Sequence, residues 1–111
     1  MTPDPELCEI VITAPSADWL EVLCRELVEN RLASSANVVR EVKSIYRWQS
    51  EIHEAREARA FVRSRIALLD AVVEYVVQRH PYDVPNVTAL PLIGGNPNYL
   101  DWIRAETSAP S

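Results

Sequence analysis

Two apolar stripes with helical spacing flank a long segment that has the composition of a strand. The first stripe lies within residues 16–31, where Ser16 follows a proline and is a suitable N-cap. The second lies within residues 68–80 and ends where Pro81 stops a helix. Between the two stripes, residues 37–48 are rich in β-branched and aromatic side chains. The pattern predicts two amphipathic helices and a strand within one α+β domain.

Shorter segments add further elements. Residues 7–13 form a short β-branched run that ends near a proline, which is typical of a buried strand. Residues 84–93 are extended, and their internal prolines place them at a sheet edge or confine the pairing to residues 86–90. Asn96 as N-cap and Pro97 at the first helical position predict a final short helix.

The segment 51–65 allows two interpretations. Residues 51–60 are among the better helix formers in the sequence, so intrinsic propensity alone predicts a helix. Against that, residues 61–65 follow an alternating pattern, and Gln49-Ser50 would suit a hairpin turn. The residues by themselves leave both interpretations open. With a strand here, the order is β-α-β-β-α-β plus a final helix, which is that of the split βαβ, ferredoxin-like sandwich.

Length and composition bound the class of protein. The chain has 111 residues, enough for one domain, which we place at residues 7–106 between a disordered lead-in (1–6) and a tail (107–111). The net charge of -5 argues against binding to nucleic acid, which needs a concentrated basic face. The sequence contains neither an apolar run long enough to span a bilayer nor the pattern of a signal peptide. We therefore expect a cytoplasmic protein.

Signatures of catalysis are missing from the sequence. There is no phosphate-binding glycine loop, no H-E-x-x-H, no C-x-x-C and no glycine-flanked serine. Cys8 and Cys24 each stand among apolar residues, which indicates buried, reduced side chains rather than reactive thiols. For His53, Glu54 and Glu57, a solvated charged surface is favoured over a metal cluster. We expect no enzymatic activity.

Several motifs occur in a fixed order along residues 9–104. They are Leu32-Ala33 leading to Asn37, Ser44-Ile-Tyr46-Arg-Trp48, Glu57, His80-Pro81-Tyr82-x-Val84-Pro85, Leu90-Pro91 and Tyr99-Leu100-x-Trp102. With this order and spacing, the chain resembles the CutA family of divalent-cation tolerance proteins. The set is far more specific than any single motif in it.

The resemblance implies a non-enzymatic protein associated with tolerance or binding of divalent cations, copper in particular. It also implies a ferredoxin-like subunit in a tight homotrimer, in which long hairpins contribute to sheets between subunits. On this basis residues 51–65 form a strand, because pairing would override their helical propensity. No cofactor is required, and the expected partners are further copies of the chain and a metal ion or small ligand.

The resemblance also suggests where ligands bind. The implied crevice residues are Tyr46, Trp48, Arg63 and Tyr82, and the implied metal ligands are His80 and Glu57. The family often has a cysteine, a proposed copper ligand, at the position of Ser35 in this chain. Because thiolates favour Cu(I), the imidazole and carboxylate that remain suit Cu(II), with weak affinity that depends on His80.

Each of these residues also has a structural interpretation. His80 can simply end the second helix, where a partly protonated imidazole complements the helix dipole. Glu57 and Arg63 share a strand face and can form an ion pair at a subunit interface. The aromatic residues that can pack in the hairpin, the core or an interface are Tyr46, Trp48, Tyr82, Tyr99 and Trp102.

A second class of function stays open. PII-like signalling or scaffold trimers share the implied architecture and bind small anionic ligands in crevices between subunits. Arg63 and Arg65 could serve such an anion. However, the glycine-rich or lysine-rich loop that would favour this class is missing from the sequence.

Overall fold

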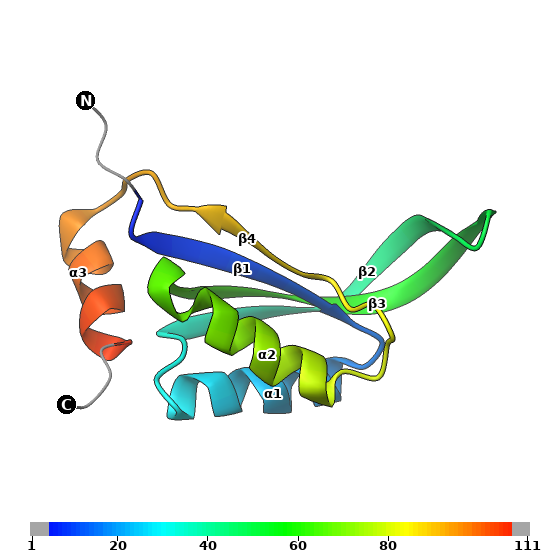
Figure 1. Ribbon diagram of the computed structural model, residues 1–111, viewed down its shortest axis with the longest axis horizontal. Coiled ribbons are helices and arrows are strands. Elements are labelled where there is room, and N and C mark those ends of the chain that lie inside the picture. Colours follow the sequence, from blue (N-terminus) through cyan, green and yellow to red (C-terminus); the bar gives the residue numbers. More distant parts are fainter. Residues whose placement is uncertain (1–4, 108–111) are drawn as a thin grey trace.

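Within residues 5–107, which the computed structural model describes, four antiparallel strands form one sheet, and two helices cover one face of it (Figure 1). The elements are β1 (Leu7–Ala14), α1 (Ala17–Glu29), β2 (Ser35–Trp48), β3 (Glu51–Arg65), the short 3-10 helix η1 (Ile66–Leu68), α2 (Leu69–Arg79), β4 (Val87–Pro91) and α3 (Pro97–Glu106). The sheet order is β2-β3-β1-β4. Helices α1 and α2 cover the sheet, and α3 lies at the end of the molecule opposite the hairpin tip.

The predicted order of elements is confirmed, including the strand over residues 51–65. Strand β3 pairs with β1 on one side and β2 on the other, so Ala60 lies opposite both Ile12 and Val38. Helix propensities differ by only a few tenths of a kcal/mol per residue between most residue types. Two ladders of backbone hydrogen bonds and burial of the alternate side chains of β3 outweigh that difference.

The core lies between the sheet and the helices α1 and α2. Core residues alternate along β1 and β3, and they recur at helical spacing on the two helices. They include Ile10, Ile12, Ala60, Val62, Leu20, Leu27, Val72 and Val76. Burial of each large aliphatic side chain contributes on the order of 1.5–3 kcal/mol. This contribution fixes which face of β3 points toward the helices.

The ends of helix α1 follow local rules. Ser16 is its N-cap, as predicted, and the Ser16 hydroxyl accepts a hydrogen bond from the Trp19 backbone N–H at 3.2 Å. The helix ends at Glu29, slightly before the predicted end, because Arg31 adopts a φ of 60° and turns the chain away. The chain then enters β2.

The β2–β3 hairpin projects beyond the rest of the sheet (Figure 1). Its register shifts between Val39 and Val42, which marks a β-bulge. Arg40, within the bulge, forms ion pairs with Asp18 and Glu21 of α1 at 2.8 and 2.7 Å. A bulge bends its strand and increases the local twist. The hairpin therefore leaves the body of the sheet at this point.

Large apolar side chains are exposed on the hairpin and near α3. Those exposed are Ile45, Tyr46, Trp48, Ile52, Leu90, Ile93, Tyr99 and Trp102. Because Tyr99 and Trp102 are exposed, they do not belong to the core of the subunit, and their predicted place at an interface stays a prediction. Exposed apolar surface of this kind is typical of an interaction surface.

Both cysteines are buried, as predicted. Burial raises the pKa of the Cys8 thiol. Burial, together with the negative charge of Glu21, raises the pKa of Cys24 to about 11. Both thiols are therefore protonated and unreactive at neutral pH.

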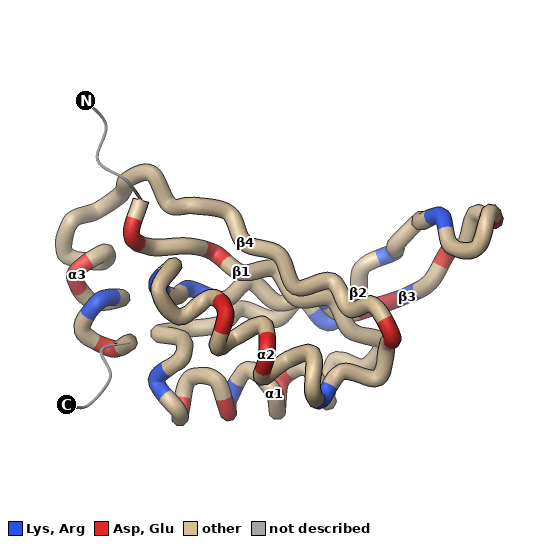
Figure 2. The backbone as a smooth tube through the Cα atoms, in the orientation of Figure 1, with Lys and Arg blue, Asp and Glu red and all other residues tan. Residues whose placement is uncertain are grey.

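Acidic and basic residues are interspersed along the chain (Figure 2). On the hairpin, Lys43 pairs with Glu54 and Arg56 pairs with Glu41, each at 3.3 Å. This part of the hairpin is thus a salt-bridged sheet surface. No helix within residues 5–107 has the length and apolar character needed to cross a membrane.

The folded body reaches slightly beyond the predicted domain bounds. Glu6, expected in the lead-in, pairs with Arg104 at 2.8 Å, and this hydrogen bond lowers the pKa of the carboxyl group. Thr107, expected in the tail, is buried, and its hydroxyl accepts a hydrogen bond from Arg65 Nε at 3.1 Å. The remainder of the predicted tail (108–111) and residues 1–4 of the lead-in lie outside the described residues.

The hairpin tip predicts a stabilising substitution. Gln49 and Ser50 both have positive φ angles, 49° and 69°, which is the combination of a type I′ turn. Asn and Gly adopt this conformation with less strain, so Gln49→Asn combined with Ser50→Gly should raise the free energy of unfolding by roughly 1 kcal/mol. Differential scanning calorimetry should show a higher Tm. The matched Gln49→Ala, Ser50→Ala variant should show no rise, and an Asn-Gly variant with a lower Tm would contradict the assignment of the turn.

Candidate functional site

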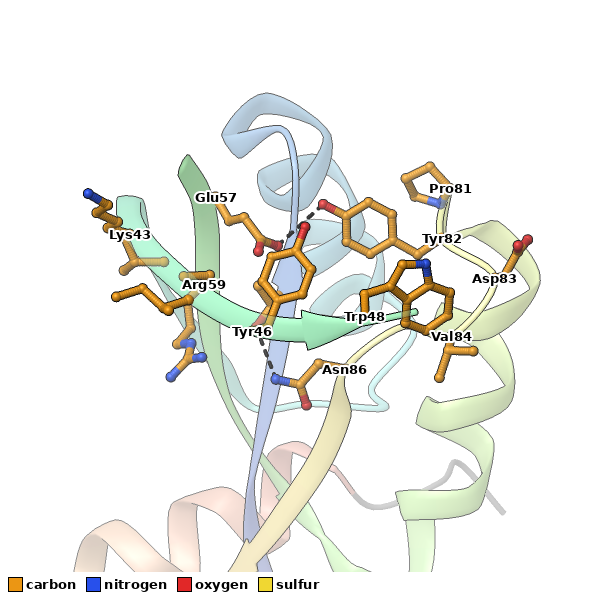
Figure 3. Close-up of a pocket in the computed structure, with 14 residues that line it drawn as sticks. Lys43, Tyr46, Trp48, Glu57, Arg59, Pro81, Tyr82, Asp83, Val84 and Asn86 are labelled. Carbon is orange, nitrogen blue, oxygen red and sulfur yellow. Dashed lines mark hydrogen bonds between the residues drawn. The ribbon is translucent and has the colours of Figure 1, made fainter. Parts of the chain in front are cut away.

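A cavity of about 770 Å³, open to solvent, lies at the base of the β2–β3 hairpin (Figure 3). Its walls come from β2, β3, the end of β1 and the loop between α2 and β4. The lining residues with the most distinctive chemistry are Tyr46, Trp48, Glu57, Arg59, Tyr82 and Asn86. Aromatic, acidic and basic side chains therefore share one cavity.

Four of the six predicted site residues line this cavity: Tyr46, Trp48, Glu57 and Tyr82. Beyond the bulge, the alternation of β2 places Tyr46 and Trp48 on the hairpin face that also carries Glu57. Tyr82 arrives from the loop that begins where α2 ends. Figure 3 shows the hydroxyl ends of Tyr46 and Tyr82 directed toward the Glu57 carboxylate.

Glu57 is a buried carboxylate at the cavity wall, only 7% exposed. The Tyr82 hydroxyl donates a hydrogen bond to Glu57 Oε2 at 3.3 Å. Burial and the neighbouring charge of Glu57 raise the pKa of Tyr82, so the hydroxyl stays protonated and remains a donor. Among residues 5–107, Glu57 forms no ion pair. The arrangement leaves a buried negative charge that a cation could approach from the cavity.

His80 is held by backbone groups and does not line the cavity. Its Nδ1 accepts a hydrogen bond from the Tyr82 backbone N–H at 3.1 Å, which places the proton of a neutral ring on Nε2. Nε2 lies 2.7 Å from the Thr13 carbonyl oxygen and donates to it. Both ring nitrogens are therefore engaged, and neither offers a metal a free lone pair. This geometry favours the helix-ending interpretation of His80 over the predicted ligand role.

Arg63, the sixth predicted site residue, lies outside the cavity. Its Nε donates to Glu9 Oε1 at 3.0 Å, across a register pair of β1 and β3, so its partner within the chain is Glu9 rather than Glu57. His53 stacks on Tyr46 with 5.6 Å between the ring centroids. Over the described part of the chain, no three His, Cys, Asp or Glu side chains gather as a metal-binding group.

Arg59 is a site residue that sequence reasoning missed. It lines the cavity, and its Nε is buried without a hydrogen-bond partner in the described structure. The signal available in the sequence was an arginine between two alanines, Ala58 and Ala60, in a segment of uncertain structure. Only the strand makes this pattern informative, because alternation sends the two alanines into the core and Arg59 to the opposite face.

Comparisons with known proteins agree with the motifs. A family model described as CutA1 divalent ion tolerance protein matches residues 8–106. The chain is 41% identical over 98 residues to the divalent-cation tolerance protein CutA of Thermus thermophilus, covering 88% of this chain and 95% of that protein. The chain spans about half the length of some other relatives, for example 55% of the rice chloroplastic protein CutA 1, to which it is 35% identical over 98 residues, or 88% of this chain.

A solved structure supports the same assignment. The divalent cation tolerance protein (Cut A1) from Thermus thermophilus superimposes with a TM-score of 0.89 and 39% sequence identity. The alignment covers 92% of this chain and 99% of the other. These findings favour the predicted family over the PII-like alternative, and the family name describes tolerance of divalent ions rather than a catalysed reaction. The chain belongs to the CutA1 family of divalent ion tolerance proteins.

Proposed function

We propose that this protein acts in divalent-cation tolerance as a non-enzymatic binding protein in the cytoplasm, assembled as a homotrimer. The observation that carries the proposal is the buried Glu57 carboxylate, which faces a solvent-open cavity and is hydrogen-bonded to a neutral tyrosine instead of paired with a cation. A buried carboxylate without a cationic partner attracts positive charge. The cavity at the base of the hairpin is accordingly the proposed binding crevice.

Exposed apolar surface on the hairpin supports the assembly. Ile45 and Ile52 on the hairpin are 66% and 61% exposed, and Ile93 near α3 is 92% exposed. Strand β2 is also an edge strand, and its unpaired backbone groups can pair with another chain. A second and third copy would cover these surfaces and complete the walls of the crevice.

Among divalent cations, copper is the one that we propose the crevice binds. A single subunit offers the Glu57 carboxylate, whereas the nitrogens of His80 are engaged and Ser35 stands in place of a thiolate. Divalent cations are held by several ligands, so a stable site requires additional groups from neighbouring copies. We therefore propose weak binding of Cu(II) through Glu57, with His80 positioning the loop that carries Tyr82.

The assembly can be tested by native mass spectrometry and light scattering. We expect a species of three times 12.6 kDa at low micromolar concentration. The charged variants Ile45→Lys and Ile52→Lys should shift the mass toward one subunit, because burial of a lysine at the interface is costly. The matched control Val22→Lys changes a similarly exposed residue on α1 and should leave the trimer intact. A stable monomer of the unmodified protein would contradict the proposal.

Metal binding can be tested by calorimetric titration of chelator-treated protein with Cu(II). The expected affinity is micromolar at best, and Glu57→Gln should weaken it at least tenfold, because the amide carries no charge. Glu54→Gln, which changes an exposed carboxylate paired with Lys43, is the control and should bind as the unmodified protein does.

The pH dependence separates the two predicted ligands. A metal ligand must be deprotonated, so binding through a carboxylate is lost only in the acidic range where carboxylates protonate. As the pH falls, binding through an imidazole is lost earlier, in the usual titration range of histidine. A loss of Cu(II) through the histidine range, or an unchanged affinity in Glu57→Gln, would contradict the role proposed for Glu57.

A further inference from the structure

The cavity wall carries a second charged side chain besides Glu57, and one atom of it is buried. Arg59 lines the same wall two residues further along β3, and its Nε is excluded from solvent without a hydrogen-bond partner in the described residues. Buried donors without an acceptor are rare in folded proteins, and each calls for an explanation such as a ligand. Because the Nε itself is excluded from solvent, an acceptor that enters from the cavity would meet the outer nitrogens of the same guanidinium.

Glu57 and Arg59 do not neutralise each other. Residues two apart on a strand have Cα atoms separated by about 7 Å and carry side chains on the same face. In the described structure no ion pair joins the two side chains, and Figure 3 shows the carboxylate and the guanidinium pointing in different directions. The cavity therefore offers one anionic and one cationic anchor at separate places.

Aromatic rings complete the anionic end. Tyr46 and Tyr82 direct their hydroxyls toward Glu57, and Trp48 lines the same cavity. The faces of such rings attract ammonium groups, and a carboxylate nearby strengthens that attraction. At the other end, the planar guanidinium of Arg59 matches the geometry of a carboxylate, which it can bind through two parallel hydrogen bonds.

The charges that line the cavity balance. Lys43 and Arg59 are basic, and Glu57 and Asp83 are acidic. Lys43 is exposed and already paired with Glu54, which leaves Arg59 as the cation that lacks a partner at the wall within the described residues. Glu57 would repel a simple anion, and Arg59 would repel a simple cation. A molecule that carries both charges finds an opposite charge at each end of the cavity.

We propose that the cavity binds a small amino-acid-like zwitterion, with its ammonium group at Glu57 among the aromatic rings and its carboxylate at Arg59. The inference rests on the proposed binding role of the crevice, but it does not depend on metal binding. It assigns a function to Arg59, which neither the motifs nor the comparisons single out.

The test uses the full chain, freed of metal by a chelator, and a series of probes of increasing length. Glycine, β-alanine, γ-aminobutyrate and longer ω-amino acids carry the same two charges at growing separation. Titration calorimetry, with tryptophan fluorescence as a second readout, should reveal an optimum length. Alkylamines and alkylcarboxylates of the same length, which carry only one charge, should bind at least tenfold more weakly than the best zwitterion.

Two substitutions identify the anchors. Glu57→Gln should weaken binding of the best zwitterion at least tenfold, so that it binds no more tightly than the alkylcarboxylate. Arg59→Gln should weaken binding of the same zwitterion at least tenfold, so that it binds no more tightly than the alkylamine. The matched controls Glu54→Gln and Arg56→Gln change exposed hairpin residues of the same types and should bind normally. Circular dichroism and light scattering establish that every variant is folded and assembled as the unmodified protein is.

The outcomes separate this inference from the proposed metal role. A zwitterion that binds while Cu(II) does not would support the inference and contradict only the metal proposal. Absence of binding by every zwitterion up to about 10 mM, the weak end for ligands of this size, would overturn it. An Arg59→Gln variant that dissociates the trimer and leaves zwitterion affinity unchanged would overturn it as well, because Arg59 would then contact another copy.

Discussion

The pairing of β3 between β1 and β2 is the constraint on which the other features depend. It forces the side chains of β3 to alternate, so Ala58 and Ala60 enter the core while Glu57 and Arg59 face the opposite side. A one-residue slip would exchange the two sets and place charges among the aliphatic residues of the helices. Burial of the core therefore determines where the charged groups of the cavity stand.

The bulge in β2 affects the direction in which the hairpin leaves the sheet. The shift between Val39 and Val42 lets the hairpin leave the body of the sheet, which turns Tyr46 toward the loop that carries Tyr82. The ion pairs of Arg40 with α1 lie at the surface and contribute little by themselves, because exposed ion pairs are screened by solvent. The direction of the hairpin therefore follows mainly from the strand register.

A chain of hydrogen bonds links the end of α2 to the cavity. The Thr13 carbonyl holds His80, His80 accepts from the backbone of Tyr82, and the Tyr82 hydroxyl reaches Glu57. His80, the predicted metal ligand, is thus joined to the cavity wall through Tyr82, which lies in the loop after α2.

The sequence by itself determined the local elements and the family. The local elements follow from the Ser16 cap, the proline after α2 and the apolar stripes, which depend on residues close in the chain. The family follows from the order and spacing of the motifs, which the sequence shows directly. Tertiary structure alone decided the partners of His80 and Arg63 and the unpaired Nε of Arg59. These depend on groups far apart in the chain: the register of β1 and β3 brings Glu9 to Arg63, and the packing of α2 on the sheet brings His80 to Thr13.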